Sequence, residues 1–117
     1  MEERDETTMQ FGNLPFTTTD WSTVPATEHP GASGTAFWRT IEAGELRVRM
    51  VEYSPGYLAG HWCNRGHVLL VLEGDLLTEL KDGRNVRLTA GMSYQVANDA
   101  VPHRSRTQTG ARLFIVD

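Results

Sequence analysis

The feature that most constrains the fold of this chain is the alternation of short β-prone segments with glycine-containing turns from Thr35 onward. No segment carries an apolar repeat of 3.6 residues across three helical turns, so no substantial helix is expected. The expected strands cover residues 36–41, 46–53, 67–72, 75–80, 86–88, 93–96, 103–107 and 113–116. About eight or nine short strands without helices between them predict an all-β protein, folded as an antiparallel sandwich or barrel.

One of these strands is apolar on both faces. Val68-Leu69-Leu70-Val71-Leu72 is an uninterrupted apolar run, which a strand with one face in water would not tolerate. We therefore expect its outer face to be covered by a second sheet, by the N-terminal segment or by another subunit. For so small a barrel we favour a homodimer.

Residues 1–34 differ from the rest of the chain. They begin with a charged run and are interrupted by Pro15, Pro25 and Pro30, so we expect a partly ordered arm that precedes a barrel over residues 35–117. The arm contains too many apolar residues for a purely disordered tail. Its segment Asp20-Trp21-Ser22 is expected to dock on the barrel or on a partner subunit.

Composition serves mainly to exclude classes of protein. The 117 residues carry a formal net charge of -4, which gives no indication of a nucleic-acid partner. The longest apolar run is far shorter than the about 20 residues of a membrane helix, and the acidic N-terminus is unlike a signal peptide. We expect a cytoplasmic protein without membrane association. The single cysteine, Cys63, cannot form an internal disulfide, so it is a buried thiol, a reactive thiol or a metal ligand.

The residues with the most chemistry lie in one stretch, Gly60-His61-Trp62-Cys63-Asn64-Arg65-Gly66-His67. In a strand, His61 and Cys63 would point to one face and Trp62 to the other. A turn or bulge that ends at Gly66, with this glycine at positive φ, would return the chain as a new strand at His67. One imidazole and one thiol would then meet a second imidazole.

A fourth candidate ligand comes from a distant segment. His103 and Ser105 share one face of a predicted strand, whereas Arg104 and Arg106 share the other. Two neighbouring arginines are costly to bury, so they are expected to face water and His103 to face inward. Three histidines and a thiol converging inside a barrel would suit a divalent transition metal such as Zn, Fe, Ni or Cu. The predicted ligands of this mononuclear site are His61, Cys63, His67 and His103.

The same stretch resembles the first motif of the cupin family, G-x5-H-x-H-x3,4-E-x6-G. Gly56, His61, Cys63, His67 and Gly74 take its positions in order, although four residues instead of five separate Gly56 from His61. Cys63 stands in place of the second motif histidine, and His67 stands in place of the glutamate. Both replacements are themselves competent metal ligands.

Gly91 and the later Val101-Pro102-His103 resemble the second cupin motif. More narrowly, the His-Trp-Cys run and the terminal Leu-Phe-Ile-Val-Asp are similar to the cupin-fold proteins named for a DHCW motif, although Gly60 stands at the aspartate position. The resemblance covers residues 35–117. It implies a double-stranded β-helix, or jelly roll, with a metal bound inside by the motif residues.

We therefore predict a small metal-binding cupin of unassigned substrate, in which the metal acts as a Lewis acid or anchors a small organic ligand. A site closed by four protein ligands would be structural or sensory, whereas a site with Cys63 detached would be open to catalysis. The alternative is a metal-free module that binds a small molecule or senses oxidants through Cys63. A third hypothesis is a dimeric structural cupin that takes no small ligand.

Overall fold

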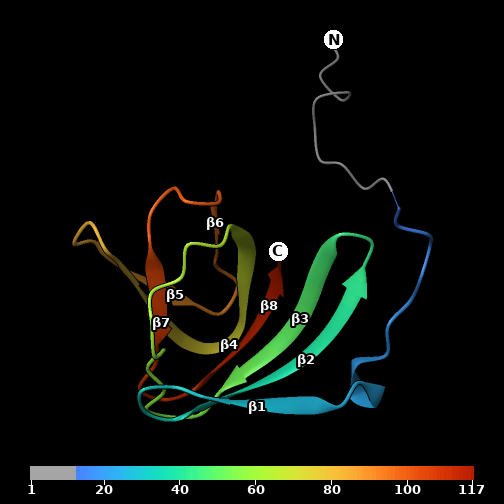
Figure 1. Cartoon of the computed structure of the whole chain (residues 1–117). Helices are drawn as coiled ribbons and strands as arrows, with labels where there is room; N and C mark the ends of the chain where they lie inside the picture. Colours follow the sequence, from blue (N-terminus) through green and yellow to red (C-terminus); the bar gives the residue numbers. More distant parts are fainter. Residues whose placement is uncertain (1–12) are drawn as a thin grey trace.

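The computed structural model describes residues 13–117, so the predicted arm before residue 13 lies outside the described part of the chain. The described residues form an all-β fold, as predicted (Figure 1). A short 3-10 helix, η2 (Trp21–Thr23), is followed by β1 (Ala26–Pro30), β2 (Thr35–Ala43), β3 (Leu46–Tyr53), β4 (His67–Leu80), β5 (Asn85–Thr89), β6 (Ser93–Val96), β7 (His103–Arg106) and β8 (Ala111–Val116). Within this described part, no helix is long and apolar enough to span a membrane.

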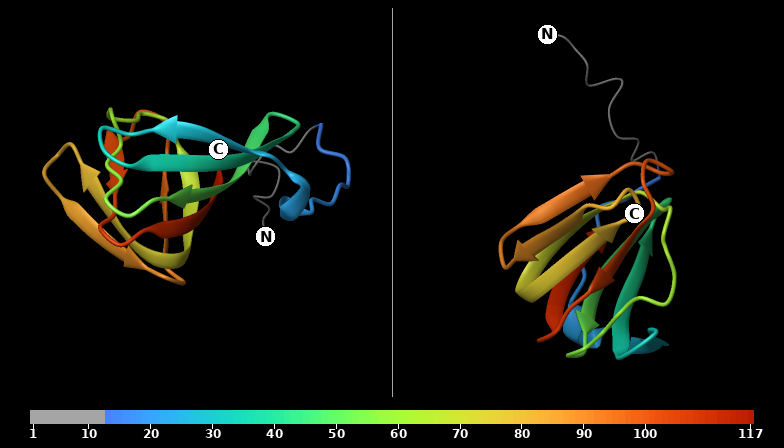
Figure 2. Two further views of the ribbon diagram at one scale, coloured as in Figure 1. Left: turned by 90° about the horizontal axis from the view of Figure 1, so that it is seen from below. Right: turned by 90° about the vertical axis from the view of Figure 1, so that its left-hand side faces the viewer.

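The strands pair antiparallel and wrap around a common interior (Figure 2). One layer contains β1, β2, β3, β8, the first half of β4, and β6. The other contains the second half of β4 with β5 and β7. The predicted hairpin of Asp75–Leu80 with residues 86–88 is formed by β4 and β5. This arrangement is the predicted jelly roll.

β4 is one strand of 14 residues, where the sequence predicted two strands, 67–72 and 75–80. The expected strands left out residues 73 and 74. Instead the strand continues through a β-bulge between Val71 and Glu73, which lets it bend from one layer into the other. Gly74 has a φ of +85°, and a Cβ there would overlap the carbonyl oxygen of Gly110. The backbone needs glycine at this bend.

β1 lies in the segment that we expected to be irregular. It pairs with the edge of β2, and the ring of His29 stacks on Trp38 with ring centroids 3.7 Å apart. Pro30, which cannot donate to a ladder, ends this edge strand. Upstream, Trp21 packs edge-on against Phe114 of β8 at 6.4 Å, which confirms that this part of the arm docks on the barrel.

The interior combines an apolar core with buried polar groups. The core consists of Ala36, Val51, Tyr53, Leu69, Val71, Leu76, Leu88, Ala111, Leu113 and Ile115. Among residues 13–117, five buried polar residues accompany it: Arg49, Thr78, His103, Ser105 and Thr107. Because buried polar groups are normally hydrogen-bonded, their partners indicate where the chemistry of the barrel lies.

Candidate metal centre

His103 begins β7 and faces the barrel interior, as the strand alternation predicted. His103 and Ser105 are buried, while Arg104 and Arg106 form ion pairs with Glu79 on the outer face. The Nδ1 atom of His103 lies 2.9 Å from the carbonyl oxygen of Val101, which can only accept a hydrogen bond. We therefore assign the ring proton to Nδ1. Nε2 is then a buried lone-pair nitrogen, and it has no hydrogen-bond partner among the described residues.

His67 is the first residue of β4, and its ring lies against that of His103 with centroids 4.9 Å apart. Its Nε2 atom is 2.8 Å from the hydroxyl of Tyr94, whereas Nδ1 is buried without a hydrogen-bond partner in residues 13–117. Burial, together with the neighbouring His103, lowers the pKa of His67 to about 4. The imidazole is therefore neutral at pH 7, as a metal ligand must be.

Cys63 is joined to His103 by two backbone hydrogen bonds. The Cys63 N–H donates to the His103 carbonyl at 2.8 Å, and the reverse bond measures 3.0 Å. Residues that pair in this way send their side chains to the same face, so the thiol lies on the interior side. Cys63 also lies near Tyr53 of the core. Burial raises the pKa of Tyr53 to about 12, and the negative charge of an ionised Cys63 adds to that rise. Sγ also accepts a hydrogen bond from the Arg65 backbone N–H at 3.3 Å.

His61 is exposed and does not lie on a regular strand. In isolated β-bridges, Leu58 pairs with Arg106 and Cys63 pairs with His103. The four residues 59–62 therefore lie opposite only two residues of β7, 104 and 105. The surplus residues bulge away from the ladder, and the alternation that we expected for this stretch does not apply to His61. Trp62 does lie outside, where its ring is 4.5 Å from the guanidinium of Arg104.

Gly66 precedes β4, which begins at His67 as predicted. The expectation that Gly66 has a positive φ is wrong: it is absent from the positive-φ glycines of the described chain. Its role is to allow a close approach, because a Cβ would lie 2.6 Å from the backbone nitrogen of Asn98. The Gly66 N–H also donates to Oδ1 of Asn98 at 2.6 Å.

The structure thus brings two of the four predicted ligands, His67 and His103, into contact and sets Cys63 beside them. It does not bring His61 to the same point. Among residues 13–117, no three His, Cys, Asp or Glu side chains are close enough in this conformation to hold a metal ion. The donors nevertheless fit a transition metal in kind, because two buried imidazoles in contact each keep an unpartnered ring nitrogen, and Cys63 pairs through its backbone with one of them.

An arginine pair on the inner face of β3 was missed by the sequence reasoning. Arg47 donates to both carboxylate oxygens of Asp117, at 2.9 and 3.1 Å, and Arg49 donates to one of them at 3.0 Å. The Asp117 side chain is only 1% exposed. Burial alone would raise the pKa of Asp117, but the hydrogen bonds of Arg47 and the charge of Arg49 hold it below its usual value. A signal was available, since Asp117 continues the inward alternation of Leu113 and Ile115.

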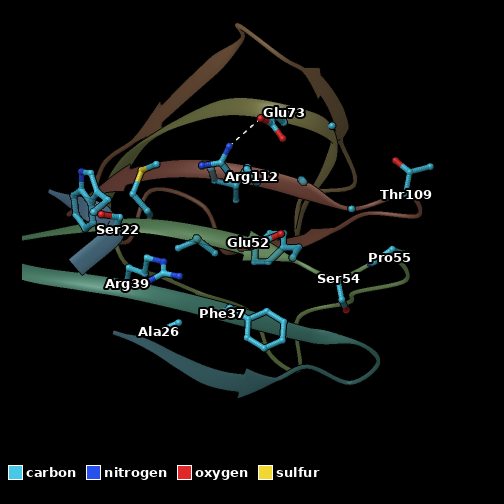
Figure 3. A pocket seen from close by; sticks show the side chains of 18 residues that line it. Ser22, Ala26, Phe37, Arg39, Glu52, Ser54, Pro55, Glu73, Thr109 and Arg112 are labelled. Atoms are coloured by element: carbon cyan, nitrogen blue, oxygen red, sulfur yellow. Dashed lines mark hydrogen bonds and ion pairs between the residues drawn. The ribbon is translucent and has the colours of Figure 1, made fainter. Parts of the chain in front are cut away.

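Two hollows on the surface of residues 13–117 differ in their lining. The larger, ≈ 920 Å³, lies on the outer face of β2, β3 and β8, and among the described residues that line it there is no predicted ligand (Figure 3). It contains the ion pair of Arg112 with Glu73 at 2.9 Å. The smaller hollow, ≈ 380 Å³, is lined by His67 and Asp117 together with mostly apolar residues. Only the smaller one reaches the candidate site.

No family model matches the chain, and no curated protein matches it. Solved structures do. A cupin-2 domain protein from Shewanella frigidimarina is 21% identical, with 68% of this chain and 78% of that chain covered and a TM-score of 0.56. A predicted oxalate decarboxylase from Thermotoga maritima is 13% identical, with 86% and 96% covered and a TM-score of 0.72. Fe(II)-HppE is 16% identical, with 87% and 60% covered and a TM-score of 0.72.

The chain therefore has the cupin fold, as its motifs predicted. At these identities the likeness concerns the fold alone, because one fold hosts many chemistries. The narrower resemblance to the DHCW-motif proteins stays a prediction, and so does the location in the cytoplasm.

Proposed function

We propose that this protein is a small metal-binding cupin, with one divalent transition metal bound inside the barrel by His67, His103 and Cys63, and with His61 joining from its exposed segment. The observation that carries the proposal is the pair of buried, unpartnered nitrogens, Nδ1 of His67 and Nε2 of His103. Leaving such a group unsatisfied costs about 1–3 kcal/mol, and coordination would offset that cost.

The surroundings of the two histidines support this assignment. The Val101 carbonyl orients His103, and the Tyr94 hydroxyl orients His67, as the outer partners of metal-binding imidazoles usually do. Imidazole and thiolate donors favour Zn, Fe, Ni or Cu over Mg or Ca. One protein of similar fold, Fe(II)-HppE, carries iron in its name. When bound, the metal would supply a Lewis acid to a small organic ligand.

Elemental analysis of protein purified without chelator tests the proposal. We expect about one equivalent of metal per chain, lost in H67A and H103A and bound more weakly in C63A, because each variant removes one donor. H61A shows whether the exposed histidine is a ligand. H29A is the matched control, because His29 stacks on Trp38 instead of joining the pair. Wild-type protein that stays free of stoichiometric metal after metal supplementation would remove the proposal.

One contact favours the second candidate, a metal-free module that senses oxidants through Cys63. The Arg65 backbone N–H donates a hydrogen bond to Sγ, and cysteine sulfur is a group that oxidants modify reversibly. In that case a thiol reagent titrates Cys63 in the native protein, and chelator leaves the stability unchanged. If Cys63 binds a metal instead, the thiol reagent does not titrate it in the native protein, and chelator lowers the stability.

We also propose that the protein is a homodimer. Val68, on the outer face of β4, is 45% exposed, and Phe16, in the arm, is 95% exposed. The outer face that bears Val68 also includes Met50 and Phe114, which form a neighbouring pair of β3 and β8, and Trp21 of the arm packs against Phe114. Large exposed apolar side chains next to one apolar sheet face are typical of an interface between subunits.

A further inference from the structure

We infer that the homodimer forms by an exchange of arms, in which Phe16 of each copy fills the larger outer hollow of the other copy. This inference deepens the proposed homodimer, on which it rests, because it names the segment and the surface that meet. It does not depend on the metal site.

The first argument is the exposed ring on the arm. Phe16 is 95% exposed, and residues 13–19 make no backbone hydrogen bond with the rest of the described chain. Both ends of this segment are nevertheless held by its own barrel. A Cβ on Gly44 would lie 3.0 Å from the Asn13 carbonyl oxygen, and Trp21 packs on Phe114. Between these two points the segment runs outside the sheet (Figure 1), so its own chain leaves the ring uncovered.

The second argument is the position and size of the larger hollow. Ser22 and Ala26, at the base of the arm, lie at one end of it, and Pro55 and Thr109 lie at the other (Figure 3). Its volume of ≈ 920 Å³ is ample for an aromatic side chain with the backbone that carries it. Phe16 is not among the described residues that line it. The hollow is therefore open to the ring of a second copy.

The third argument is the match in polarity and charge. The hollow is lined by the large apolar side chains of Trp21, Phe37 and Met50, which suit a phenyl ring. Its charged lining residues balance, being two arginines and two glutamates: Arg39, Glu52, Glu73 and Arg112. Residues 13–19, Asn-Leu-Pro-Phe-Thr-Thr-Thr, carry no charge. An uncharged segment with one aromatic anchor leaves no charge unpaired in such a hollow.

The fourth argument is symmetry. Trp21 and Met50 line the hollow and also belong to the outer face that we propose as the dimer interface. Each copy carries both the ring and the hollow, so a single two-fold rotation makes both contacts at once. Phe16 precedes Trp21 by five residues, a reach of up to about 17 Å in an extended chain. An arm of this length can cross from the rim of its own barrel to the hollow of its partner.

Cysteine cross-linking tests the exchange in a C63S background, which contains no other cysteine. F16C is combined with M50C or with E52C, and the protein is oxidised in air. We expect a disulfide-linked species of twice the 13.1 kDa chain mass in non-reducing electrophoresis. Peptide mapping should show bonds from position 16 to positions 50 and 52. Because Phe16 and Glu52 are both exposed, F16C with E52C carries the test if M50C disturbs the fold.

F16C with V86C is the matched control. Val86 is 40% exposed but lies on β5, in the other layer, so no bond should join positions 16 and 86. Light scattering of the C63S protein separates the two proposals. A dimer without a bond from position 16 to the hollow, or a bond within one chain, would overturn the exchange and leave the homodimer standing. A monomer would overturn both.

Discussion

His67 is the residue at which the proposed metal site approaches Asp117 and its two arginines. One ring nitrogen lies against the Tyr94 hydroxyl, and the other is unpartnered, 3.9 Å from a carboxylate oxygen of Asp117. Neutral imidazole is the form that this environment favours. His67 can therefore donate a lone pair without adding charge to an interior that already holds the buried Arg49.

The free energy of unfolding of the metal-free protein should fall as the pH decreases from about 6.5 towards about 4. Burial, together with His103, lowers the pKa of His67 to about 4 in the folded state, whereas an unfolded imidazole titrates near 6.5. Between these values the unfolded state binds more protons, so the contribution is full above 6.5 and is lost on acidification. Urea unfolding in steps between pH 7 and pH 5 measures it. H67Q should flatten the slope, and an equal slope in both proteins would contradict the assignment.

The direction of a side chain could be predicted from the sequence where it depended only on the alternation of a strand. The inward direction of His103 followed from the outward direction of Arg104 and Arg106, which the structure confirms. The same argument, that an arginine is unfavourable to bury, did not predict that Arg47 and Arg49 face inward, because it assumed arginines without a charged partner. A carboxylate supplied by Asp117, almost seventy residues away in sequence, changes that balance, and local pattern does not reveal such a partner.

β4 is the element on which the arrangement of the site depends. Its first residue, His67, belongs to the candidate site, and its bend carries the chain into the opposite layer, where it pairs with β7 and thus with His103. The sequence identified both halves of β4 but not their continuity, since glycine followed by aspartate is also typical of a turn. It likewise could not reveal the bulge before Cys63, which depends on pairing with a distant strand.

Gly74→Ala should destabilise the protein by about 2 kcal/mol or more, because the residue has a φ of +85° and the new Cβ would overlap the Gly110 carbonyl. Gly83→Ala is the matched control. Gly83 also has a positive φ, +103°, but a Cβ there would meet nothing within 4 Å, so only about 1 kcal/mol should be lost. Urea unfolding of the two variants measures the difference. Equal losses would show that the close approach at the bend is unimportant.

At the scale of the whole molecule, the pattern of short strands and two ligand-bearing motifs sufficed to predict the cupin fold. The homodimer is the part of the prediction that concerns the outer surface. We expected a homodimer because the run that contains Val68 is apolar on both faces. In the single chain, Val68 is 45% exposed. The inner face of that run is accounted for, because Leu69 and Val71 belong to the core.

V68E and F16A should each shift the protein from dimer to monomer in size-exclusion chromatography with light scattering, where the wild type should show twice the 13.1 kDa mass of one chain. A buried charge or a lost aromatic anchor at an interface has this effect. V86E is the matched control. Val86 is 40% exposed but lies on β5, in the other layer, so its variant should remain dimeric. A monomeric wild type at micromolar concentration would refute the proposed interface.

The bent strand β4 has one more consequence, for how the chain tolerates being cut. Its two halves are hydrogen-bonded into different layers, so a peptide-bond break near Gly74 would deprive both layers of a continuous strand at once. A break or an inserted tag at the exposed tip Asp82–Gly83 would interrupt only the connection between β4 and β5. Two fragments divided at that tip should reassemble, whereas fragments divided at the bend should not.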